Sequence, residues 1–126
     1  MAACWAFDDE DHPVAAQALE RLRTDPARAP CLWWFELRNT LVVNERRGRL
    51  TEADTAAFLR HVARLPVTLD PTPEDGAALI LARAHRLTIY DAAYLELAQR
   101  TSLPLATLDT ALARAARAEG VALIGA

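Results

Sequence analysis

The sequence predicts an α/β domain of three layers, in which helices flank both faces of a parallel sheet. Two observations lead to this prediction. Short apolar runs alternate along the chain with segments whose apolar residues recur at helical spacing. The length of 126 residues suits one domain, and the content of 52% hydrophobic and 25% charged residues is that of a soluble globular protein. We therefore expect a single domain over residues 1–126.

The N-terminal half is expected to contain three helices and two strands. Pro13 suits the first turn of a helix, Gly48 suits a helix end, and Thr51 with Asp54 forms a capping-box pattern. The expected elements are a helix over Val14–Thr24, a strand over Ala29–Trp34, a helix over Phe35–Gly48, a helix from Thr51 to about Arg64 and a strand over Val67–Leu69.

The C-terminal half continues the alternation. Cap-like residues precede two of its helices, and Gly120 suits the end of the third. The expected elements are a helix opened by Thr72–Asp75, a helix from Thr88 to Arg100, a strand over Leu103–Leu108, a helix over Thr110–Ala118 and a strand over Val121–Ile124.

Several classes of protein are not expected from the composition. The chain has no apolar run long enough for a membrane span and no signal-peptide pattern, so a cytoplasmic location is expected. Cys4 and Cys31 have no metal-ligand spacing, and their apolar neighbours predict buried free thiols in a reducing compartment. The three histidines are scattered along the chain, which does not favour a zinc site.

The basic residues are all arginines. The net charge of −3 gives the whole molecule no general attraction to nucleic acid. Arg46, Arg47 and Arg49 nevertheless cluster, with Arg38 upstream, and arginine binds phosphate and stacks on bases. Two interpretations stay open: an RNA-binding cluster, or a solvated helix end favoured by the helix dipole.

Five acidic residues lie near expected helix starts, namely Glu36, Asp54, Asp75, Asp91 and Asp109. An acid in this position has an ordinary explanation, because it can cap free N–H groups and it suits the helix dipole. Asp54 and Asp75 match cap patterns, and we interpret both as caps.

Glu36 and Asp109 differ because each follows an expected strand. Ligands of parallel α/β sheets bind beyond the carboxyl ends of the strands. Two carboxylates at one edge repel each other unless they share a cation or a proton. Oxygen ligands without nearby His or Cys favour Mg²⁺ or Mn²⁺, which can activate water for attack on a phosphodiester. Spacing alone leaves Asp91 out, since it follows a helix.

Three blocks of sequence resemble those of PIN-domain ribonucleases, in particular VapC-like toxins of type II toxin–antitoxin systems. The blocks are Trp34–Leu41, Tyr90–Ala98 and Leu105–Asp109, in order and suitably spaced. The resemblance implies that Glu36, Asp91 and Asp109 are catalytic residues that bind a metal or position water. It also implies that Thr107 supports the metal site and that Asn39 contacts a water on the metal.

The start of the chain departs from the family pattern. The family's first strand ends in an aspartate that binds metal, whereas Met1–Phe7 resembles the helix after that strand. Asp8, Asp9 and Asp11 resemble the acidic loop beyond it. We expect a start codon assigned too late, so that the first strand is lacking here, and translation of the DNA upstream of Met1 tests this hypothesis.

The leading functional interpretation is therefore a Mg²⁺- or Mn²⁺-dependent endoribonuclease, the toxin of a toxin–antitoxin pair. The resemblance implies an RNA substrate, a small antitoxin as partner and a homodimer, and the Arg46–Arg49 cluster would guide the RNA backbone. One alternative is a catalytically inactive PIN-like protein that binds antitoxin or RNA without cleavage. Another is an unrelated α/β domain whose acids are ordinary helix caps.

Overall fold

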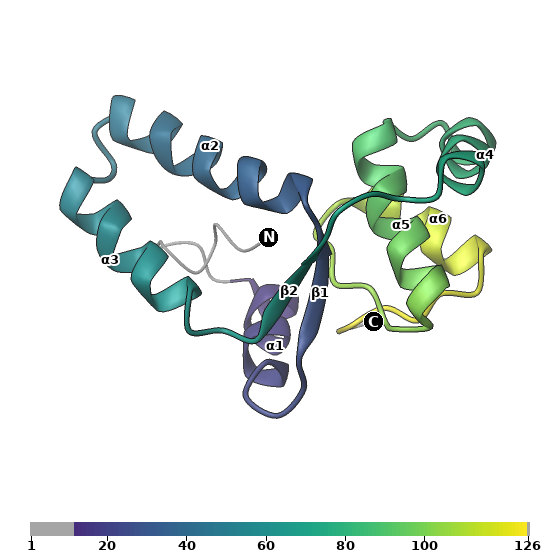
Figure 1. The fold of residues 1–126 in the computed structure, drawn as a ribbon, viewed down its shortest axis with the longest axis horizontal. Coiled ribbons are helices and arrows are strands. Elements are labelled where there is room, and N and C mark those ends of the chain that lie inside the picture. Colours follow the sequence, from purple (N-terminus) through teal and green to yellow (C-terminus); the bar gives the residue numbers. More distant parts are fainter. Residues whose placement is uncertain (1–11, 126) are drawn as a thin grey trace.

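The computed structural model describes residues 12–125, and it alternates helices with short strands as the sequence predicts (Figure 1). Helices lie on both sides of the central pair of strands, which confirms the α/β class. The elements are α1 (Pro13–Arg21), β1 (Ala27–Pro30), α2 (Leu32–Arg46), α3 (Glu52–Val62), β2 (Val67–Asp70), α4 (Asp75–His85), α5 (Ile89–Thr101) and α6 (Thr110–Ala118).

β1 and β2 pair in parallel, as expected. Ala27 lies beside Val67 at one end of the pair, and Pro30 lies beside Asp70 at the other. The backbone N–H of Cys31 extends the pairing by donating to the carbonyl of Asp70 at 2.9 Å. The carboxyl ends of both strands therefore lie together, directly before α2 and before the segment that leads to α4.

The predicted strands over Leu103–Leu108 and Val121–Ile124 are wrong in extent, because the structure has a single parallel bridge between Leu105 and Leu123. The N–H of Leu105 donates to the carbonyl of Ala122 at 2.8 Å, and the N–H of Ile124 donates to the carbonyl of Leu105 at 3.0 Å. Pro104 has no N–H to extend this ladder. The direction of pairing was predicted, but the length was not.

The predicted strand over Ala29–Trp34 is also wrong at its second half, because α2 already begins at Leu32. The aromatic residues of this run belong to the helix, whose inner face continues with Leu37 and Leu41, 3% and 0% exposed. Apolar residues at helical spacing outweighed the strand preference of Trp33 and Trp34. Glu36 consequently lies in the second turn of α2.

The helix caps agree with the sequence in most places. Thr51 and Asp54 form the expected capping box, with both hydrogen bonds at 3.0 Å. At α4 the prediction that Asp75 is the cap was wrong. Glu74 takes this role, and its carboxylate accepts hydrogen bonds from the N–H groups of Gly76 and Ala77.

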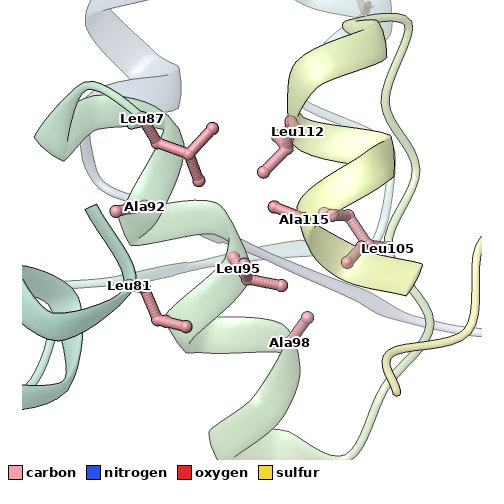
Figure 2. Packing of buried hydrophobic residues seen from close by; sticks show 9 residues of the cluster. Leu81, Leu87, Ala92, Leu95, Ala98, Leu105, Leu112 and Ala115 are labelled. Atoms are coloured by element: carbon pink, nitrogen blue, oxygen red, sulfur yellow. The ribbon is translucent and has the colours of Figure 1, made fainter. Parts of the chain in front are cut away.

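Two groups of buried residues stabilise the fold. The larger group joins α4, α5 and α6 around Leu81, Leu95 and Leu112 (Figure 2). The smaller group consists of Leu37, Leu41 and Val62, and it holds α2 against α3. Figure 1 shows α2 and α3 on one side of the strand pair and α4, α5 and α6 on the other.

In residues 12–125 no helix has the length and apolar character needed to cross a membrane. Cys31 is a free thiol, as predicted, but the prediction that it is buried was wrong. It lies at the exposed turn between β1 and α2, where its Sγ donates to the carbonyl of Pro71 at 3.1 Å. Cys4 and the acids Asp8, Asp9 and Asp11 lie outside the described residues.

Candidate active site

The first part of the candidate site is formed by α5, on which Asp91 and Tyr94 are one helical turn apart. Thr88 caps this helix, because its Oγ1 accepts a hydrogen bond from the N–H of Asp91 at 3.1 Å. Residues three apart on a helix share a face. The cap and the helical spacing together place the Asp91 carboxylate and the Tyr94 ring on the same side of α5.

Asp91 interacts electrostatically with Asp109. The pKa of the Asp91 carboxyl is raised above its usual value, first by burial and then by the negative charge of Asp109, against the opposing effect of a hydrogen bond with Thr88. A negative charge raises the pKa of a carboxyl in this way only when it lies near that carboxyl. The structure therefore brings together two acids that are far apart in the sequence, and their repulsion favours a bound cation.

Asp109 has a structural role as the N-cap of α6. Its Oδ1 accepts a hydrogen bond from the N–H of Leu112 at 2.9 Å. The Oγ1 of Thr107 in turn accepts a hydrogen bond from the N–H of Asp109 at 3.1 Å, which fixes the backbone before the helix. A carboxylate has more acceptor sites than one cap uses, so capping is compatible with a second role.

Glu36 is connected to this pair through Tyr94. The hydroxyl of Tyr94 donates to Oε1 of Glu36 at 2.5 Å, across two helices and 58 residues of sequence. The pKa of Tyr94 is raised well above its usual range by burial, by this hydrogen bond, and by the charges of Glu36 and Asp91. Tyr94 thus lies within electrostatic reach of both acids and stays protonated as a hydrogen-bond donor.

The structure brings some of the predicted acids together, but not all three. In the part of the chain that the structure describes, no three His, Cys, Asp or Glu side chains lie close enough to form a metal-binding group. The spacing rule selected Glu36 and Asp109, whereas the charge interaction that the structure displays joins Asp91 and Asp109. The donors are all carboxylate oxygens, which suits a hard cation such as Mg²⁺ or Mn²⁺.

The remaining predicted site residues lie along α2. Asn39 is exposed one turn after Glu36. Arg46 and Arg47 are exposed at the helix end, about 15 Å from Glu36 along the helix axis. Arg49 Nη1 donates to Oδ1 of Asn44 at 3.2 Å, so this side chain also orders the turn after the helix.

The model of the PIN domain family matches residues 2–118. The chain belongs to the PIN-domain family. Among curated proteins it is similar to "Ribonuclease VapC3" of Mycobacterium tuberculosis, at 35% identity over 99 residues, which are 75% of this chain and 69% of that protein. The same protein from a second strain matches equally well. The resemblance to VapC-like PIN domains is thereby confirmed.

Two residues of this PIN domain were overlooked in the sequence. Tyr94 lies in the family block Tyr90–Ala98, and its spacing of three from Asp91 places it on the same helix face. Asp70 closes β2, the position that made other acids candidates. It is 7% exposed and bonded to Arg100 and Arg28, which identifies it as part of a buried ion network.

Proposed function

We propose that this PIN domain, taken as a single domain, is a metal-dependent endoribonuclease and the toxin of a toxin–antitoxin pair. The observation that supports it best is the interaction of Asp91 with Asp109, together with the Tyr94 hydrogen bond that connects Glu36 to the same region. A carboxyl whose pKa is raised by burial and by a neighbouring acid is frequent at functional sites, including those that bind a cation. The similarity to "Ribonuclease VapC3" supports a ribonuclease and a VapC-like toxin.

The proposed cofactor is Mg²⁺ or Mn²⁺. Such an ion, when bound, activates water and neutralises charge on the phosphate. Asp91 and Asp109 would hold it, since the repulsion between them is relieved by a positive charge. Glu36 would be a third ligand or would position water. The reaction would be hydrolysis of a phosphodiester with the 3′-hydroxyl as leaving group.

The other residues of the chain orient these acids. Tyr94 holds the Glu36 carboxylate through the hydrogen bond at 2.5 Å. Thr107 fixes the backbone of Asp109, and Asn39 lies one turn from Glu36, where it would contact water near the metal.

The proposed partners are RNA, a small antitoxin and a second copy of the chain. Arg46, Arg47 and Arg49 would guide the RNA backbone, which makes binding sensitive to salt. Ile80 is 66% exposed and Leu79 43% exposed on α4, and these apolar side chains suit a protein partner. The free thiol of Cys31 is compatible with the proposed cytoplasmic location.

Cleavage of total cellular RNA tests the proposed activity. The wild-type chain should cleave with Mn²⁺ and not with EDTA, and Asp91→Asn and Asp109→Asn should each reduce cleavage to background. Asp54→Asn is the matched control, because Asp54 caps α3 and interacts with Thr51. Cleavage that persists in both variants, or in EDTA, contradicts the proposal. RNA binding without cleavage under any condition would instead support the inactive binding protein.

A further inference from the structure

Each of two candidate acids follows directly after an exposed aromatic residue. Phe35 precedes Glu36 and is 65% exposed, and Tyr90 precedes Asp91 and is 62% exposed. Aromatic side chains bury a large apolar area when they pack in a core, so rings this open to water are available for contact with a ligand. The two rings belong to different helices, α2 and α5, which the Tyr94–Glu36 hydrogen bond joins.

On α2 the exposed ring is part of an ordered cluster. Trp34 and Phe35 contact edge to face, with ring centroids 4.9 Å apart and planes at 69°. The guanidinium carbon of Arg38 lies 4.0 Å from the centroid of the Trp34 ring, and Nη1 of Arg38 donates to the Trp34 carbonyl at 3.3 Å. We call Trp34, Phe35 and Arg38 the α2 platform. It combines aromatic surface with a positive charge immediately before Glu36.

We propose that the α2 platform and Tyr90 stack unpaired bases of the RNA strand whose phosphate reaches the acids. The inference rests on the proposed function and names the residues that would position its RNA substrate. Bases that are free of a duplex stack on aromatic rings and on arginine planes, whereas bases in a helix already stack on their neighbours. The platform therefore favours single strands, loops or ends over duplex RNA.

Charge complementarity distinguishes this surface from an ordinary apolar contact face. Arg38 adds a cation that attracts the phosphate backbone, whereas exposed apolar residues on α4, such as Leu79 and Ile80, are aliphatic. The platform also lies next to Glu36 in sequence and structure, where a substrate must approach. A second copy of the chain is the competing occupant, and the experiment below detects it.

The test measures binding without cleavage. A fluorescein-labelled, mixed-sequence single-stranded oligoribonucleotide is titrated with the full chain in EDTA, and its anisotropy is compared with that of the same strand in a duplex. Phe35→Leu keeps apolar bulk but removes the ring, and it should weaken single-strand binding about tenfold. Phe35→Tyr should retain affinity. Leu103→Ala, at a position after α5 that is 41% exposed, is the control for loss of apolar surface.

The outcomes separate this inference from the proposed function. Three results would overturn the proposal that the α2 platform binds RNA bases. They are an unchanged affinity of Phe35→Leu for single strands, an equal loss of affinity for duplex RNA, and no RNA binding by the wild type. A change in sedimentation of Phe35→Leu without a change in RNA affinity assigns the face to a second copy and also overturns it. Ring-dependent binding by a chain that never cleaves RNA with Mn²⁺ supports the platform while the proposed activity fails.

Discussion

At the scale of single residues, Tyr94 is the side chain that links α5 to α2 within the candidate site. Its ring is half-buried, and its hydroxyl donates to Glu36 at 2.5 Å. The raised pKa of Tyr94 means that this donor keeps its proton at any physiological pH. Since Glu36 itself is exposed, the hydrogen bond restricts a carboxylate that would otherwise sample several rotamers.

Tyr94→Phe should therefore reduce RNA cleavage while the fold is maintained. A hydrogen bond to a charged group is worth about 1.5–3 kcal/mol, so kcat/KM should fall roughly tenfold to a hundredfold. Initial rates on a labelled oligoribonucleotide with Mn²⁺ measure this change, and circular dichroism checks the fold. Thr24→Val removes a hydroxyl from the exposed turn after α1 and should cleave like the wild type. If Tyr94→Phe cleaves RNA at the wild-type rate, Tyr94 does not position Glu36 for catalysis.

Asp109→Asn separates capping from metal binding at one residue. Asparagine caps helices as well as aspartate does, so the melting temperature without metal should stay near that of the wild type. It should even rise slightly, because a like charge near Asp91 is removed. Saturating Mn²⁺ should stabilise the wild type, by about 2.7 kcal/mol at roughly a hundredfold excess over Kd, and should leave the variant unchanged. Thermal melting with and without Mn²⁺ measures this difference. If Mn²⁺ stabilises both proteins equally, Asp109 is not a ligand.

At the scale of elements, the carboxyl end of β2 is tied to α5 by a buried ion network. Arg100 donates to Asp70 at 2.7 Å and to Glu96 at 2.7 and 3.0 Å, and Arg28 donates to Asp70 at 3.2 Å. Asp70 and Glu96 are 7% and 3% exposed. Buried charges are tolerated when they are paired and hydrogen-bonded, so this network fixes the strand relative to the helix that carries Asp91.

The network predicts how stability depends on pH. Hydrogen bonds from Arg100, aided by the charges of Arg100 and Arg28, hold the pKa of Asp70 below its usual value despite burial. A depressed pKa in the folded state stabilises the fold above the unfolded pKa of about 3.9, and this contribution is lost as the pH falls through the lower folded pKa. Asp70→Asn should therefore be less stable than the wild type at pH 7, by about 1.5–3 kcal/mol.

The difference in free energy of unfolding between Asp70→Asn and the wild type should shrink as the pH falls below about 4. Urea titrations from pH 7 to pH 2 measure it. Arg100→Met is the companion variant, and it should cost more, about 3 kcal/mol at pH 7, because buried Glu96 loses its ion pair while Asp70 keeps its ion pair with Arg28. A constant difference between Asp70→Asn and wild type across this range would argue against the ionised network.

How well the sequence predicted each element depended on local signals. The bounds Thr110–Ala118 of α6 were predicted correctly, since a capping acid precedes the helix and Gly120, with φ of +73°, follows it. The start of α2 was wrong because aromatic residues favour strands and also suit a helix face. The C-terminal strands were overextended because strand length depends on the neighbouring chain, which apolar content does not reveal.

At the scale of the whole molecule, the candidate site depends on contacts between distant segments. The strand-edge rule selected Glu36 and Asp109 from position alone, but it missed Asp91, whose interaction with Asp109 arises from how α5 packs against α6. Only the family resemblance selected Asp91. Neither the strand-edge rule nor the family resemblance predicted the hydrogen bond from Tyr94 to Glu36, because no local pattern shows which residue on α2 a tyrosine on α5 will contact.

The division of the core into two groups predicts that stability is uneven across the molecule. α5 contributes several buried residues to the larger group, including Leu95 at 0% exposure, whereas Val62 is the buried residue of α3. Segments with few buried apolar contacts open locally at a lower free energy than the core. We therefore expect the backbone amides of α3 to exchange with deuterium faster than those of α5 under native conditions.

Two leucines that are both fully buried provide the matched variants for this last prediction. Leu95→Ala weakens the larger group and should cost about 2–5 kcal/mol, so it should speed exchange in α5. It should leave the exchange rate of α3 unchanged if α2 and α3 open while the larger group stays folded.

Leu41→Ala destabilises the native state relative to both the local opening and global unfolding, so it should speed exchange in α3 and α5 alike. Hydrogen exchange resolved by mass spectrometry distinguishes these patterns. If Leu95→Ala accelerates α3 as much as α5, the two groups unfold as one cooperative unit, and the Tyr94–Glu36 hydrogen bond joins helices that do not separate before the fold is lost.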